Sequence, residues 1–214
     1  MKILFFGDSI TDACRAREKT YVPALDLGCG FVQQIAGRLC EKSPTGYEIV
    51  NTGIGGDRVV DLYARVKLDC WNHEPDLISI LVGINDVWHE LIRKNGVEPD
   101  RFERVYRMMI EDTKKKLPNA KMLLCAPFVL KAKPLEKEWE AFCDCHIYAE
   151  IVEKLAREYG LYFLPLQEKI NKAAEKYGNE AILFDGVHPA LQGAVLIANE
   201  WLKKFEAIEE DMKK

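Results

Sequence analysis

The amino-acid sequence predicts an α/β fold, a three-layer α/β/α sandwich built on a five-stranded, mostly parallel sheet. Short apolar runs alternate with longer segments of helical period along the 214 residues. The runs contain no alternating polar positions, which is typical of strands buried on both faces. Strand followed by helix, repeated, is the pattern of a parallel sheet covered by helices on both sides.

Five apolar runs are the expected strands, and each ends at small or polar residues or at proline. They lie at 3–6, 47–50, 77–82, 122–126 and 161–164. Expected helices occupy 30–41, 58–71, 98–117, 136–159, 166–177 and 190–205. Within 136–159, Ile147, Ile151 and Leu155 recur at four-residue spacing among charged residues, which indicates an amphipathic helix. The charged tail from 206 to 214 is expected to fray.

The alternation of strand and helix favours one domain spanning 1–214. No repeat, low-complexity tract or Gly/Ser linker interrupts it. The alternation of strand and helix also continues across the two longest irregular segments, 11–29 and 127–135. A chain of this length buries enough apolar surface for one core without disulfide or metal staples. Long loops after strands are where ligands bind in sheets of this kind.

Charge and cysteine content exclude several classes of partner and favour one compartment. The net charge is −4 with no basic block, so nucleic acid and anionic membranes are poor partners. No stretch reaches the 18 apolar residues of a membrane span, and the apolar run at the N-terminus is too short for a signal peptide. Seven scattered cysteines fit reduced thiols. We therefore expect a cytoplasmic protein.

Three polar clusters follow strands and predict a site before any family is considered. They are Ser9, the glycine turn 53–57, and Asn85 with Asp86. Because the carboxyl ends of parallel strands share one edge of a sheet, these clusters should converge there.

A serine hydroxyl is a weak nucleophile until a base accepts its proton, and His188 is the best candidate for that base. It follows Asp185 by three positions, a spacing that lets the carboxylate bind Nδ1 and leaves Nε2 free. His73, His89 and His146 lack a comparable arrangement. Without Ser9, however, Asp185 and His188 are equally well explained as a hydrogen bond at a helix start.

Acyl chemistry also needs donors for the developing oxyanion. The backbone amide of Ser9, an amide of the glycine turn and the side chain of Asn85 are the candidates. The spacing does not decide whether Gly55 or Gly56 supplies the second amide.

Four sequence blocks, in order, resemble those of the SGNH hydrolases, the GDSL-type esterases and lipases. They are Gly7-Asp8-Ser9-Ile10, Asn51 to Asp57, Gly83-Ile84-Asn85-Asp86 and Asp185 to Pro189. The resemblance implies a flavodoxin-like SGNH hydrolase fold and a serine esterase without cofactor or metal. It assigns the nucleophile to Ser9, the oxyanion donors to Ser9, Gly56 and Asn85, and the base and its partner to His188 and Asp185. Ile10 stands where the family name has leucine.

Within that family the sequence is most similar to intracellular carbohydrate deacetylases of the acetyl xylan esterase type. Gly7 to Arg17, Gly83 to Trp88 and Pro127-Phe128 carry this similarity. It implies short-chain acetyl ester hydrolysis on carbohydrates such as xylo-oligosaccharides. The candidate substrate-binding residues at the same edge are Asp8, Arg58 and Trp88, although solvated charge also explains Arg58.

Several alternatives remain open at this point. The same fold could act on longer acyl chains, as a lysophospholipase or thioesterase, or bind carbohydrate without hydrolysis. Aspartates near the strand ends, at positions 8, 12, 57 and 86, could form the metal site of a phosphoesterase, although loop aspartates commonly bind nearby amides. Cys143, Cys145 and His146 form at most half a zinc site, because no second pair follows. A homo-oligomer is also compatible with the sequence.

Overall fold

The structure, a computed structural model, describes residues 1–18 and 22–213. Five strands form one sheet in the order β2-β1-β3-β4-β5, and every neighbouring pair is parallel. The strands are β1 (Lys2–Gly7), β2 (Glu48–Asn51), β3 (Leu77–Leu81), β4 (Lys121–Cys125) and β5 (Tyr162–Leu164). The predicted fold class and all five strands are confirmed, and the sheet is entirely rather than mostly parallel.

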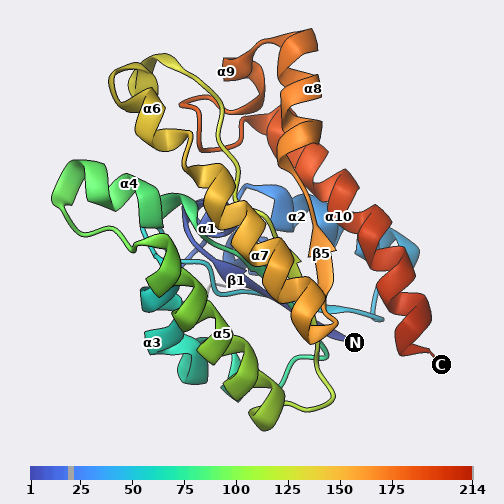
Figure 1. Cartoon of the computed structure of the whole chain (residues 1–214). Helices are drawn as coiled ribbons and strands as arrows, with labels where there is room; N and C mark the ends of the chain where they lie inside the picture. The colour runs from blue at the N-terminus through green and yellow to red at the C-terminus, as the bar shows by residue number, and fades with distance from the viewer. Residues whose placement is uncertain (19–21, 214) are drawn as a thin grey trace.

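Helices cover both faces of this sheet (Figure 1). One layer contains α3 (Val59–Asp69), α5 (Pro99–Lys116) and α7 (Cys145–Tyr159), and the other contains α2 (Phe31–Lys42) and α10 (Leu191–Met212). The central strands β1 and β3 are almost wholly buried between the layers. This burial explains why their sequences are continuous apolar runs.

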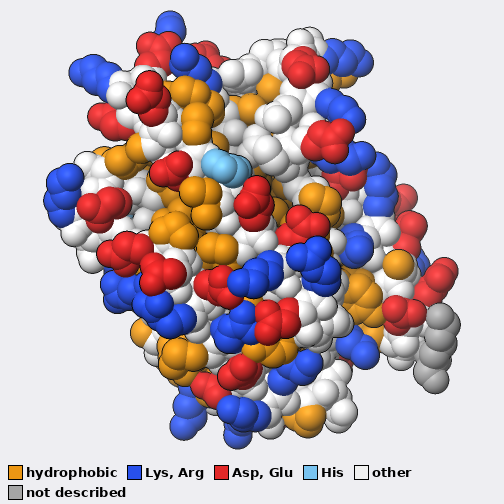
Figure 2. Space-filling model, in the orientation of Figure 1, with side chains coloured by type: hydrophobic (Ala, Val, Ile, Leu, Met, Phe, Trp, Pro, Cys, Tyr) orange, Lys and Arg blue, Asp and Glu red, His pale blue; other side chains and the backbone are white. Residues whose placement is uncertain are grey.

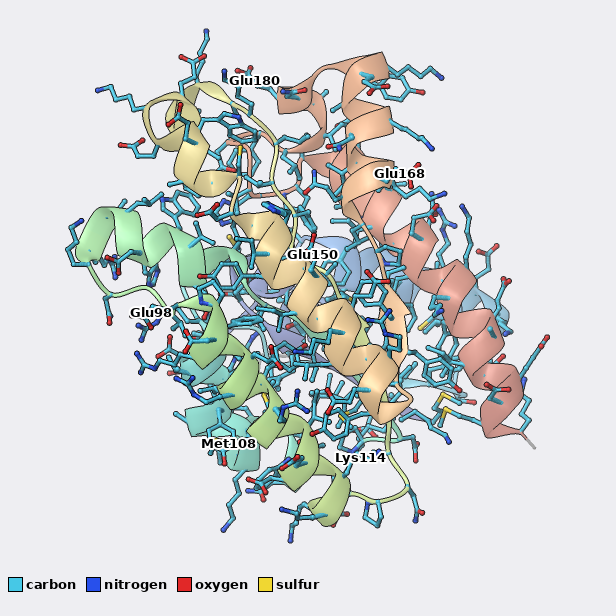
Figure 3. All side chains as sticks on the ribbon, in the orientation of Figure 1. Glu98, Met108, Lys114, Glu150, Glu168 and Glu180 are labelled. Carbon is cyan, nitrogen blue, oxygen red and sulfur yellow. The ribbon has the colours of Figure 1, made fainter. Side chains whose placement is uncertain are left out.

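The outer surface mixes charges of both signs. Figure 2 shows acidic and basic side chains interspersed over the face formed by α5 and α7. Figure 3 labels Glu98 and Lys114, which lie near the two ends of α5. Among the described residues, none of the helices combines the length and the apolar character that a membrane span requires.

Several other helical segments connect these elements. They are α1 (Ser9–Asp12), η1 (Pro23–Leu27), η2 (Trp71–His73), η3 (Lys133–Glu138), α6 (Trp139–Phe142), α8 (Gln167–Tyr177) and α9 (Asn179–Ile182). A further helix, α4 (Ile84–Arg93), was not expected from the sequence because its first turn contains the polar Asn85-Asp86 motif. The prediction of a single helix over 136–159 is also wrong, because the helix is interrupted at 143–144, between α6 and α7.

The expectation of a frayed C-terminal tail is wrong as far as Met212. Helix α10 continues to that residue because Ile208 is fully buried and Glu209 is 6% exposed. The Glu209 carboxylate is bonded to Lys42 at 2.7 Å, to Lys213 at 3.0 Å and to the Tyr47 hydroxyl. These contacts attach the end of α10 to α2 and to the segment before β2.

Candidate active site

Ser9 begins the short helix α1 directly after the central strand β1. Asp8 caps this helix, since its Oδ1 accepts the N–H of Ile10 at 3.0 Å. The cap fixes the turn from strand to helix, and so the hydroxyl of Ser9 is held at the carboxyl edge of the sheet.

A chain of hydrogen bonds joins Ser9 to residues near the other end of the sequence. Ser9 Oγ lies 2.8 Å from His188 Nε2, and His188 Nδ1 lies 2.6 Å from Asp185 Oδ2. The second carboxylate oxygen of Asp185 accepts the backbone N–H groups of Val187 at 2.9 Å and His188 at 2.7 Å. The structure therefore brings together the three residues that the sequence analysis had selected.

The loop that carries Asp185 and His188 is fixed by its own backbone. Leu183 and Pro189 form an isolated antiparallel bridge, and the N–H of Phe184 donates to the carbonyl of His188 at 3.0 Å. Gly186 has φ +92°, and a Cβ there would lie 2.5 Å from the carbonyl oxygen of Leu130. Only glycine fits this turn. The turn brings the carboxylate of Asp185 within hydrogen-bonding distance of the His188 ring.

The aspartate sets the electrostatics of the imidazole. The hydrogen bond that His188 donates to Asp185 raises the pKa of His188 above 6.5, and it outweighs burial, which acts in the opposite direction. Burial raises the pKa of Asp185, but hydrogen bonds from the His188 ring and backbone overcome it, so that the pKa falls below its ordinary value. The pair thus favours a negative carboxylate beside an imidazole of increased basicity.

The two adjacent amides of the glycine turn differ in their hydrogen bonds. The N–H of Gly55 donates to Asp12 Oδ2 at 2.9 Å, whereas the N–H of Gly56 makes no hydrogen bond with the described part of the chain. The side chain of Asn85 donates to the carbonyl of Asp57 at 3.0 Å, which holds its amide group next to this turn. An amide nitrogen carries two hydrogens, so a second donor remains on Asn85. These contacts favour Gly56 over Gly55 as a donor.

A cavity of about 700 Å³ opens beside Ser9. Its walls include Ile10, Arg15, Arg17, Phe31 and Phe184, together with His188. Both arginines are engaged, because Arg15 and Arg17 donate to the carbonyl of Gly53 at 2.8 and 2.9 Å. The cavity therefore offers mainly apolar wall next to the hydroxyl.

The three candidate substrate-binding residues have different surroundings. Asp8 is 1% exposed and lies beneath the site, where burial raises its pKa to about 7. Arg58 is bonded to Asp61 at 2.8 Å and to the carbonyl of Asn95 at 2.6 Å, so its guanidinium is committed to the protein. Trp88 packs with its ring centroid 6.0 Å from that of His188.

Phe184 is a site residue that the sequence analysis missed. Its ring stacks on His188 at 5.8 Å between centroids and 21° between planes, and it is 57% exposed. Its position directly before Asp185 was the signal that could have identified it.

The other histidines lie outside the bonded set. His89 packs near the glycine turn, 3.8 Å from where a Cβ on Gly56 would lie, and burial lowers its pKa. The Nδ1 of His146 lies 2.5 Å from the carbonyl of Cys143. Over residues 1–18 and 22–213, no group of three or more His, Cys, Asp or Glu side chains is arranged to hold a metal ion.

Comparisons with known proteins identify the family. The model of the GDSL-like lipase/acylhydrolase family matches residues 5–196. The chain belongs to this family, and it is a carboxylic ester hydrolase.

Individual relatives agree in sequence and in structure. The chain is 31% identical to the acetylxylan esterase of Geobacillus stearothermophilus over 95% of this chain and 93% of that protein, and the solved structure of that enzyme superposes with a TM-score of 0.83. A GDSL-like lipase structure from Parabacteroides merdae has 35% identity and a TM-score of 0.87, covering 95% of this chain and 94% of its own. Thioesterase 1/protease 1/lysophospholipase L1 of Escherichia coli is 26% identical over 94% of this chain and 81% of that protein.

Proposed function

We propose that this protein is a serine esterase that removes acetyl groups from carbohydrates such as xylo-oligosaccharides. The observation that carries the proposal is the 2.8 Å contact between Ser9 Oγ and His188 Nε2, continued to Asp185 at 2.6 Å. The substrate class is supported by the acetylxylan esterase relative, an acetyl-xylooligosaccharide esterase of Geobacillus stearothermophilus.

In the proposed reaction, His188 accepts the proton of Ser9 as Oγ attacks the ester carbonyl carbon. The N–H groups of Ser9 and Gly56 and the side chain of Asn85 stabilise the negative oxygen that forms. His188 then protonates the departing sugar hydroxyl, which leaves an acetyl group on Ser9. Water attacks this acyl-enzyme with the same histidine as base, and acetate leaves. Asp185 holds the histidine tautomer throughout.

Solved structures of the Geobacillus stearothermophilus enzyme support these roles. Three of them are described as catalytic mutants, in which a serine, an aspartate or a histidine is replaced by alanine. Ser9, Asp185 and His188 are the same three residue types.

The test is acetate release from acetylated xylo-oligosaccharides by the wild type and by Ser9→Ala. We expect the variant to lose at least about a thousand-fold in kcat with an unchanged melting temperature. A variant of His73, whose carbonyl binds Lys2 at the opposite end of β1 from Ser9, serves as the control for a lost histidine when it is compared with His188→Ala. Full turnover by Ser9→Ala would remove Ser9 from the mechanism.

The longer-chain alternative has one observation in its favour, the cavity of about 700 Å³ beside Ser9. This volume exceeds what an acetyl group needs. Rates on acetyl, octanoyl and palmitoyl esters of one alcohol separate the two functions. A rate that falls with chain length supports the deacetylase, and a rate that rises supports a thioesterase or lysophospholipase.

We further propose a single domain in the cytoplasm, able to form a homo-oligomer. All seven cysteines are free, which fits a reducing compartment. Cell fractionation and light scattering in solution test the location and the assembly.

A further inference from the structure

One arginine outside the Ser9, His188 and Asp185 set is bonded to several parts of the site at once. Arg65 lies in the middle of α3, and its side chain is 14% exposed. Its Nε donates to Asp57 Oδ2 at 2.6 Å, its Nη1 to the carbonyl of Thr52 at 2.7 Å, and its Nη2 to the carbonyl of Gly7 at 3.1 Å.

The plane of this guanidinium is fixed by two further contacts. It lies over the ring of Phe6, 4.5 Å from the ring centroid, and Nη1 also donates to Asp69 at 2.9 Å. A rigid planar fork that binds four acceptors in different directions cannot be reproduced by the single ammonium of lysine.

The groups that Arg65 holds are those that position the proposed oxyanion site. Gly7 ends β1 two residues before Ser9, and Thr52 and Asp57 flank the glycine turn that contains Gly56. The carbonyl of Asp57 in turn accepts the side chain of Asn85 at 3.0 Å. Arg65 is therefore connected through Asp57 to Gly56 and Asn85, and through Gly7 and Asp8 to Ser9.

The turn needs such an external support. Three of its residues are glycines, which have no side chain to pack and large backbone freedom. The side chain of Asp57 is only 13% exposed, and without its arginine partner the carboxylate would be drawn toward water together with the peptide that binds Asn85. A displacement of about 1 Å in a catalytic group can cost on the order of 100-fold in rate.

We propose that Arg65 is a positioning residue for the oxyanion site. It holds the glycine turn in a fixed position relative to the end of β1. This inference rests on the proposed function. Arg65 itself does not reach the substrate, since its bonds are directed to the protein and it does not line the cavity beside Ser9.

Arg65→Lys is the test, and Arg107→Lys is its matched control. Arg107 is also partly buried, at 27% exposure, and binds Glu103 at 2.9 Å, Glu158 at 2.9 Å and the Tyr159 hydroxyl at 3.0 Å. It too lies over an aromatic ring, that of Tyr159. It joins α5 to the end of α7, away from the glycine turn, so its loss affects stability without touching the site.

We expect Arg65→Lys to lower kcat by about 10- to 100-fold at 20 °C, well below its melting temperature, with KM changed less than about 3-fold. The affinity for a boronic acid, whose tetrahedral adduct on Ser9 places an oxygen in the same site, should fall by a similar factor. Arg107→Lys should lower the melting temperature only. Equal kcat values and boronate affinities in the two variants would overturn the inference.

A double-mutant cycle with Asn85→Ala tests the route of the effect. Because Arg65 acts partly through Asn85, the Arg65→Lys loss should be smaller in the Asn85→Ala background than in the wild type. Losses that multiply fully would contradict the inference.

Ser9→Ala in the same assay keeps the two proposals apart. An inactive Ser9→Ala with an unimpaired Arg65→Lys overturns the role of Arg65 alone. A fully active Ser9→Ala overturns the proposed function, and the positioning role fails with it.

Discussion

The carboxylate of Asp12 accepts the backbone N–H of Gly55 at 2.9 Å. This bond occupies the first of two neighbouring amides in the glycine turn, whereas the second, that of Gly56, has no hydrogen-bond partner in the described chain. A side chain 43 positions away thus favours one of two adjacent glycines as the oxyanion donor.

Alanine at each glycine in turn tests this assignment. Gly56 has φ +87°, so an alanine there strains the backbone and displaces the amide. We expect Gly56→Ala to lower kcat by about 100-fold, as the loss of one oxyanion donor does. At Gly55 a Cβ would lie 3.5 Å from Asp12 and 3.8 Å from Ser9, both ordinary contacts, so Gly55→Ala should cost far less. Steady-state kinetics that rank the two variants in reverse would exclude Gly56.

The pH dependence of kcat/KM should follow His188, which must be neutral to accept a proton. Its pKa is raised above 6.5 by Asp185, so activity falls as the pH drops through that raised value. In Asp185→Asn the imidazole loses its negative partner, so the acid limb should move to lower pH while the plateau falls about 1,000-fold or more. Asp100→Asn, at an exposed helix start, is the control. An unmoved acid limb in Asp185→Asn would assign the titration to another group.

Asp8 should make the protein less stable as the pH rises from 4 to 7. Burial raises its pKa to about 7 in the folded state, against about 3.9 for an unfolded aspartate. The charge of His188 lowers this pKa and the charge of Asp57 raises it. In that window the folded protein keeps a proton that the unfolded chain loses, so the free energy of unfolding decreases by up to a few kcal/mol.

Asp8→Asn should remove this decrease, because asparagine also caps a helix and carries no charge. Melting temperatures of the two proteins measured from pH 4 to 7 provide the test. Parallel curves would show that Asp8 does not titrate there.

Phe184 should govern the preference for sugar esters. It is 57% exposed, stacks on His188 and lines the cavity, so it can support the face of a sugar ring. We expect Phe184→Ala to raise KM for acetylated xylo-oligosaccharides about 10-fold and to change KM for p-nitrophenyl acetate little. Tyr177→Ala, which removes another exposed aromatic ring, is the control. Equal effects on both substrates would place the sugar elsewhere.

Most of the fold could be predicted because the strands are buried on both faces and leave continuous apolar runs. The helix α4 could not, since Asn85 and Asp86 in its first turn have the polarity of a loop and are nevertheless 4% and 1% exposed. The interruption between α6 and α7 at 143–144 contains no proline or glycine that would have indicated it. Both the start of α4 and the interruption at 143–144 are determined by packing in the folded protein rather than by the local sequence.

The residues of the site, like the elements of the fold, could be predicted from the sequence only in part. Ser9 and His188 could be selected because residues at strand ends meet at one edge. Arg65 could not, because an arginine in the middle of a helix has the pattern of a solvated surface charge until its four acceptors are placed around it. The sequence placed Asp8 among the candidate substrate-binding residues, but it did not indicate that this side chain lies buried beneath the site.

The hydrogen bond between Ser9 and His188 joins residues that are 179 positions apart. In the proposed mechanism the nucleophile therefore meets its base only after β1 and the loop between α9 and α10 have both reached their folded positions. A partly folded chain in which that loop is detached is expected to be inactive, even where β1 and its neighbouring strands have formed.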